Sequence, residues 1–173
     1  MRPTSFASSD CITRPCTKHN YLVKDVNQLS RVLHEAFYVA RTGRPGPVVV
    51  DIPKDIQFAK GVYTGLTNSQ HKSYRPQYDG DERAIAAAVD VIANAKRPIF
   101  YTGGGIINSG PEASKRLREF VHMTGYPITS TLMGLGAFPA SDKRWVGMPG
   151  MHGTVEANMA MQNCDVLLAI GAR

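Results

Sequence analysis

The second half of the chain alternates short apolar runs rich in β-branched residues with longer runs whose apolar residues recur every three or four positions. The short runs, at residues 98–102, 127–131 and 165–170, are bounded by turn-forming residues and predict buried strands. The longer runs, from about residues 81, 110 and 154, predict helices. Strands that alternate with helices favour a parallel sheet with right-handed crossovers. The sequence therefore predicts an α/β fold, a parallel sheet with flanking helices.

Local signals place the ends of these helices. Asp81 is a candidate N-cap, Pro111 suits the first turn of the second helix, and Gly125 suits its end. Each of the first two helices also has one apolar face that we expect to be buried. These faces are Ile85, Ala88, Val89 and Ile92 in the first helix, and Ala113, Leu117, Phe120 and Val121 in the second.

The first part of the chain predicts only a fragment of an α/β domain. A helix is expected from Asp25 to about Arg41, ended by Gly43, with a buried strand over residues 47–52. Its expected buried face is Val26, Leu29, Leu33, Ala36, Phe37 and Ala40. Residues 54–80 lose this periodicity, which is typical of a connection between domains. We predict a first-domain fragment over residues 1–55, a linker over 56–80 and a second domain over 81–173.

The net charge of +6 lies entirely within the first 78 residues, and the remainder is balanced. A basic half is compatible with a nucleic-acid-binding module. Its basic residues are scattered without interleaved aromatic residues, which disfavours nucleic acid as a partner. A non-catalytic interaction module, whose basic surface packs against other protein, stays open as an alternative.

Other classes are excluded by the residues that the chain lacks. No apolar run approaches the length of about 18 residues that a membrane-spanning helix needs. Three cysteines are too few for a disulfide framework, and the five histidines have no metal-ligand spacing, so no metal site is expected. The Ser-rich basic opening is too short for a transit peptide and has no secretory apolar segment. We expect a reducing, cytoplasmic location.

Glycine-rich segments follow the predicted strands, where parallel α/β sheets bind ligands. They are Gly103–Gly105, Leu132–Gly136 and Gly171, and a further loop, Met148–Thr154, precedes the third helix. Glycines at these places either let backbone amides approach a phosphate or ring, or simply form tight turns. The segment beginning at Gly103 lacks the third glycine of a dinucleotide fingerprint, which disfavours an ordinary nicotinamide site.

Six strings, in this order and spacing, resemble the large catalytic subunit of acetolactate synthase, a thiamine-diphosphate enzyme family. They are Ile12–Asn20, Gly43–Val48, Asp51–Asp55, Tyr101–Gly105, Ser130–Gly136 and Gly150–Thr154. The resemblance runs from about Ile12 to Arg173, whereas residues 1–11 do not resemble the family. The last two strings argue against the related pyruvate oxidases and glyoxylate carboligases, which stay as alternatives.

The resemblance implies an enzyme of three α/β domains, of which this chain would supply the end of the pyrimidine-binding domain, the linker and most of the central domain. The family condenses pyruvate with a second pyruvate or with 2-oxobutanoate, releasing CO2, in branched-chain amino-acid biosynthesis. Its cofactors are thiamine diphosphate with Mg²⁺, and FAD held by the central domain. The implied partners are the 2-oxo acid substrates, further copies in a homodimer or higher oligomer, and a regulatory small subunit.

The resemblance also assigns site residues. Those implied to contact FAD are Arg44, Gly104, Thr131, Leu132, Pro149, Gly150, Met151, His152, Gly171, Ala172 and Arg173. Lys18 and Lys54 resemble basic residues of the substrate channel, or they are ordinary surface lysines. The family's catalytic glutamate is expected upstream of this chain, and its diphosphate- and magnesium-binding segment downstream. No catalytic residue is therefore assigned, and the chain alone is expected to be inactive.

Overall fold

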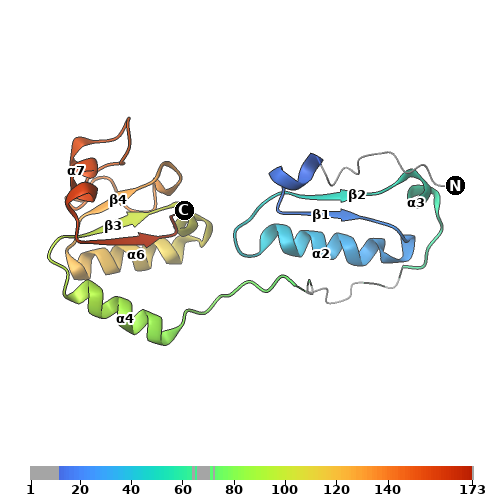
Figure 1. The fold of residues 1–173 in the computed structure, drawn as a ribbon, viewed down its shortest axis with the longest axis horizontal. Coiled ribbons are helices and arrows are strands. Elements are labelled where there is room, and N and C mark those ends of the chain that lie inside the picture. Colours follow the sequence, from blue (N-terminus) through green and yellow to red (C-terminus); the bar gives the residue numbers. More distant parts are fainter. Residues whose placement is uncertain (1–11, 64, 66–70, 72, 173) are drawn as a thin grey trace. The chain divides into compact units, whose positions relative to one another are not determined.

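The computed structural model describes residues 12–63, 65, 71 and 73–172. The chain divides into two compact units, Met1–Asp79 and Gly80–Arg173. Each unit has its own parallel sheet (Figure 1). Each also has its own apolar core. The predicted α/β class with parallel sheets and flanking helices is confirmed.

Unit 1 is built on two parallel strands, β1 (His19–Leu22) and β2 (Val48–Asp51). A 3₁₀ turn, η1 (Arg14–Cys16), precedes β1, and a second one, η2 (Val26–Gln28), leads into helix α2 (Leu29–Arg41). Figure 1 shows α2 lying along both strands. A short helix, α3 (Lys54–Phe58), occupies the beginning of the predicted linker. Neither β1 nor α3 was expected from the sequence.

The buried face predicted for α2 is confirmed in part: Ala36 is buried, and Val26 and Leu29 pack against the apolar cluster of unit 1. The residues buried in α2 itself are Val32, Glu35, Ala36 and Val39, whereas Leu33 and Phe37 are exposed. The prediction assumed one continuous α-helix, with about 3.6 residues per turn, from Val26 onward. The chain instead forms a 3₁₀ turn at Val26–Gln28, and its three residues per turn shift the phase of everything that follows. The predicted helix end is confirmed, because α2 stops at Arg41 and Gly43 takes φ +56°.

Unit 2 contains the three predicted strands, β3 (Pro98–Thr102), β4 (Ile128–Ser130) and β5 (Val166–Ile170). They are parallel in the order β4-β3-β5, so the chain moves outward from β3 to β4 and then crosses back to β5. The helices are α4 (Glu82–Ala93), α5 (Gly104–Asn108), α6 (Pro111–Thr124) and α7 (Val155–Asn163), with a 3₁₀ turn η3 (Leu132–Gly134). Only α5 and η3 were not expected as elements.

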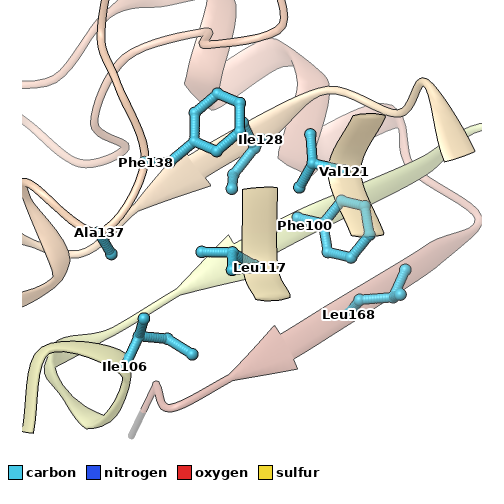
Figure 2. Packing of buried hydrophobic residues seen from close by; sticks show 8 residues of the cluster. All are labelled: Phe100, Ile106, Leu117, Val121, Ile128, Ala137, Phe138 and Leu168. Atoms are coloured by element: carbon cyan, nitrogen blue, oxygen red, sulfur yellow. The ribbon is translucent and has the colours of Figure 1, made fainter. Parts of the chain in front are cut away.

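The core of unit 2 lies between the sheet and α6. Leu117 and Val121 of α6 pack with Phe100, Ile128 and Leu168 of the strands (Figure 2). Burying such side chains stabilises a fold by about 1.5–3 kcal/mol each. The predicted face of α6 is therefore confirmed.

Helix α4 does not bury its predicted face. Asp81 caps it as expected, accepting a hydrogen bond from the Ala84 amide at 2.8 Å. Ile85 and Val89 are nevertheless exposed, and only Ile92 packs against the core. The helix is held at its C-terminal end, where the Tyr126 hydroxyl donates to the Ile92 carbonyl at 3.2 Å. The spacing correctly predicted an amphipathic helix but could not show that this unit leaves its apolar face uncovered.

Candidate functional site

The loop tips that follow the three strands of unit 2 lie against one another. The Gly103 amide donates to the Ile170 carbonyl at 3.0 Å, and the Gly105 amide to the Gly171 carbonyl at 2.9 Å. On the other side of β3, the Thr131 amide donates to the Thr102 carbonyl at 2.8 Å. Three segments that are far apart in the sequence therefore form one continuous edge, at the carboxyl ends of the strands. This is where ligands bind in open α/β sheets, at the point where the strand order reverses.

The glycines of this edge allow the loops to approach closely. A Cβ on Gly105 would lie 2.7 Å from the Gly171 Cα, and one on Gly134 would lie 2.7 Å from the Thr102 carbonyl oxygen. Gly171 also has φ +64°, a conformation that side chains disfavour. Packing of loop on loop therefore explains why glycine stands at these positions, and the tight-turn interpretation of them has a physical basis.

A cluster of buried hydroxyls lies directly beneath this edge, on Thr102, Thr129 and Ser130. The Thr102 and Ser130 hydroxyl oxygens are 2.7 Å apart, and the Thr129 hydroxyl donates to the Gly147 carbonyl at 2.7 Å. These bonds fasten the ends of β3 and β4 to each other and to the segment at Gly147. This cluster was not expected from the sequence, although hydroxyl residues at the ends of two neighbouring apolar strands were a visible signal for it.

A fourth segment reaches the same edge beside β4. Trp145 forms a parallel bridge with Ile128, and the Val146 amide donates to the Ile128 carbonyl at 3.1 Å. The chain then enters the loop Met148–Gly153, which closes with a bond of 3.0 Å from the Gly153 amide to the Gly150 carbonyl. Because this segment runs parallel to β4, the loop stands beside the carboxyl end of β4.

Large apolar side chains project from this edge into solvent. Leu132 is 68% exposed, Met133 75% and Met151 90%. Clustered exposed apolar side chains are typical of binding surfaces. Beside the glycine-backed loops, they suit a flat, largely apolar ring better than a small polar ligand.

The structure brings most of the predicted FAD-contacting residues to this edge. Those on the three strand tips are Gly104, Thr131, Leu132, Gly171 and Ala172, and those on the neighbouring loop are Pro149, Gly150, Met151 and His152. Arg44 belongs to unit 1, where it is an exposed residue of the turn between α2 and β2. Arg173 lies outside the described residues, as do residues 1–11.

The two lysines predicted for a substrate channel have different surroundings. Lys54 is exposed at the start of α3. The Lys18 ammonium group instead lies at the C-terminal end of α2, where it donates to the carbonyls of Val39 and Thr42, both at 2.6 Å, and of Arg44 at 2.8 Å. It also donates to the Tyr74 hydroxyl at 3.0 Å.

These bonds make Lys18 a cap on α2. A cation at this end of a helix is favoured by the partial negative charge of the last carbonyls. The hydrogen bond from Lys18 also holds the pKa of the Tyr74 hydroxyl below its ordinary value. The contacts reach 21 to 56 residues along the chain, so the local sequence carried no signal for them.

A pocket of about 300 Å³ lies beside Lys18. It is lined by Arg14, Thr17, Lys18, His19 and Asn20. Next to it on β1, the Tyr21 hydroxyl is buried and makes no hydrogen bond in the described structure. Burial raises the pKa of this hydroxyl to about 12, and the nearby Glu35 carboxylate acts in the same direction.

The residues that the structure describes contain no group of three or more His, Cys, Asp or Glu side chains placed to hold a metal ion. No helix among them is long and apolar enough to cross a membrane.

Comparison with known families identifies the kind of domain that unit 2 forms. Residues 85–173, just over half of the chain, match the model of the thiamine pyrophosphate enzyme central domain. The chain therefore belongs to this family of domains.

The curated relatives are more specific, and they confirm the resemblance seen in the sequence. The acetolactate synthase large subunit of Corynebacterium glutamicum is 48% identical over 94% of this chain, which covers 26% of that protein. The acetolactate synthase isozyme 3 large subunit of Escherichia coli is 45% identical over 94% of the chain, covering 28% of that protein. A probable chloroplastic acetolactate synthase 2 of rice is 47% identical over 93%. The chain thus spans about a quarter of the length of these relatives.

Proposed function

We propose that this chain is a segment of an acetolactate synthase large subunit. In that enzyme, pyruvate would condense with a second pyruvate or with 2-oxobutanoate, releasing CO2, on the way to branched-chain amino acids. The identity of 45–48% to curated acetolactate synthases, sustained over 94% of the chain, supports this proposal. A cytoplasmic location, a homodimer or higher oligomer and a regulatory small subunit belong to the same proposal.

The division of the chain fits that proposal. Residues up to about 55 would complete the pyrimidine-binding domain, residues 56–80 would be the linker, and residues 81–173 would form most of the central domain. Two observations support these limits: the compact units meet at Asp79 and Gly80, and the family match begins at residue 85.

Within the chain we propose that the carboxyl edge of unit 2 holds FAD. The observation that carries this is the meeting of three loop tips at one edge of one sheet, with a fourth segment running beside β4. FAD, when bound, supplies flat isoalloxazine and adenine rings joined by a diphosphate. Met151 and Leu132 would pack against ring surfaces, and the backbone at Gly104 and Gly171 would allow close approach.

We propose that thiamine diphosphate and Mg²⁺ are bound by other parts of the enzyme, and that this chain alone does not catalyse the condensation. A colorimetric acetolactate assay with pyruvate, thiamine diphosphate, Mg²⁺ and FAD should give no turnover above the blank.

Flavin binding tests the central proposal. Titration of the purified chain into FAD should quench and shift the flavin fluorescence in a saturable way. Met151→Ala should weaken binding by roughly fivefold, since it removes apolar contact area without disturbing the core. Met123→Ala is the matched control: Met123 is 78% exposed near the end of α6, and its removal should leave affinity unchanged. A flavin spectrum that never departs from that of free FAD would overturn the assignment.

A further inference from the structure

The loop Met148–Gly153 is held by one side chain that none of the predictions includes. Asn158 lies on α7, eight residues beyond Gly150. Its side-chain oxygen accepts from the Gly150 amide at 2.8 Å, and its side-chain nitrogen donates to the Gly150 carbonyl at 2.9 Å. The two bonds join one side-chain amide to both polar groups of a single residue.

This contact bears directly on the turn that presents Met151 and His152. The Gly150 carbonyl also accepts from the Gly153 amide at 3.0 Å, which closes the four-residue turn Gly150–Gly153. Met151 and His152 are the two central residues of that turn, and both are exposed. Asn158 therefore fixes the first residue of the turn, on which the direction of both side chains depends.

The rest of the loop is anchored at its base. The Thr154 amide donates to the Met148 carbonyl at 2.9 Å, and the Thr154 hydroxyl donates to the Val146 carbonyl at 2.5 Å. Gly150 itself has φ +119° and open space around the position of a Cβ. Asn158 supplies both of the hydrogen bonds that reach Gly150 from outside the turn, so it is the contact that holds this conformation from α7.

We infer that Asn158 is a positioning residue for the candidate flavin edge: it presets the Gly150–Gly153 turn so that Met151 and His152 face the ligand before it arrives. The inference rests on the proposed flavin function for its ligand, but not for the ordering of the loop. Ordering the turn in advance raises affinity, because less conformational freedom is lost on binding.

The experiment uses the full chain, Asn158→Ala, Asn158→Asp and a control, Asn163→Ala. Asn163 stands on the same helix and donates only locally, to the Met159 carbonyl at 2.7 Å. The Asp variant keeps an acceptor for the Gly150 amide but places a carboxylate oxygen against the Gly150 carbonyl. Two readouts are compared: amide hydrogen exchange of residues 148–153 without ligand, and the dissociation constant for FAD from flavin fluorescence.

Asn158→Ala should speed exchange at Gly150 about tenfold and raise the dissociation constant about tenfold, as expected for the loss of one or two hydrogen bonds. Asn158→Asp should show an effect of the same sign, and Asn163→Ala should change neither by more than about twofold, within the effect of one exposed bond. The unfolding midpoints of the variants, measured by circular dichroism, should equal that of the unmodified chain. Equal midpoints would show that the loss of affinity does not come from loss of the fold.

Three other outcomes would each contradict a part of this inference. If amide hydrogen exchange of residues 148–153 is unchanged in Asn158→Ala, Asn158 does not order the loop and the inference is wrong. Faster exchange with unchanged flavin affinity overturns its role toward the ligand. Absence of flavin binding in the unmodified chain overturns the proposed function and with it the positioning role, while the exchange data still decide whether Asn158 orders the loop.

Discussion

At the scale of single residues, Asp142 connects the long loop after β4 to the end of α6. Its carboxylate accepts from the Arg144 amide at 2.9 Å and lies 2.9 Å from the His122 ring nitrogen. The Arg144 guanidinium adds a contact at 3.2 Å. The pKa of Asp142 lies below its ordinary value. The largest cause is the hydrogen bond from the Arg144 amide, and the His122 and Arg144 side chains act in the same direction. The ionised carboxylate is therefore the form that the folded loop prefers.

Asp142→Asn should consequently lower the stability of unit 2 in a pH-dependent way. A carboxyl group whose pKa is lowered by folding stabilises the fold above its unfolded pKa, near about 4, and loses that contribution as the pH falls through the folded value. The urea midpoint of the variant should be below that of the unmodified chain at pH 7, and the difference should shrink as the pH is lowered below about 4.

The fluorescence of Trp145, the single tryptophan of the chain, reports this unfolding. Asp90→Asn provides the control, because Asp90 is an exposed acidic residue on α4 of the same unit. The prediction is contradicted if the difference in urea midpoint between Asp142→Asn and the unmodified chain stays constant down to about pH 2–3. The protonated and ionised carboxyl groups would then stabilise the loop equally.

At the scale of elements, the C-terminal end of α2 depends on one distant lysine. Lys18 donates to three backbone carbonyls in and after the last turn of the helix, and its fourth partner, the Tyr74 hydroxyl, itself donates to the Thr42 carbonyl at 2.7 Å. The turn that carries Arg44 is therefore fixed by Lys18, directly before β1, and by Tyr74. Any role of Lys18 toward a substrate would compete with this structural one.

Lys18→Met should destabilise unit 1 by about 1–3 kcal/mol, because it keeps the aliphatic stem but leaves carbonyls at the helix end without a donor. Faster amide hydrogen exchange in residues 36–46, without any ligand present, is the expected measurement. Lys24→Met is the matched control, since Lys24 is an exposed lysine of the same unit. Equal exchange in the two variants would show that the cap contributes nothing to stability.

The elements also show which features a sequence can predict. The strand Pro98–Thr102 was predicted to the residue, because a short β-branched run between turn residues is a local signal. The buried face of α2 was not, since a 3₁₀ turn at Val26–Gln28 changed the phase. That the loop tips share one edge followed from the predicted parallel direction of the strands, whereas Asn158 and Lys18 act through tertiary contacts that no local pattern encodes. Asn158 is also uncharged and belongs to no motif, so nothing in the sequence indicated its role.

At the scale of the whole molecule, each unit has a core of its own. Val23, Val32 and Ile56 form the buried cluster of unit 1, and the cluster around Phe100 and Val121 belongs to unit 2. Trp145 packs against the second cluster only. Its fluorescence should therefore follow the unfolding of unit 2, whereas far-ultraviolet circular dichroism follows the helices of both units.

Separate cores predict separate responses to the same substitution. Val121→Ala removes two methyl groups from a fully buried site and should destabilise unit 2 by about 2 kcal/mol, lowering the urea midpoint seen by Trp145. Val32→Ala makes the same change at a buried site of unit 1. It should move part of the circular dichroism transition and leave the Trp145 transition in place, because sites without shared contacts contribute independently. If Val32→Ala lowered the urea midpoint seen by Trp145 as far as Val121→Ala does, the two units would unfold as one cooperative body. The boundary near Gly80 would then separate two compact units whose stabilities are coupled.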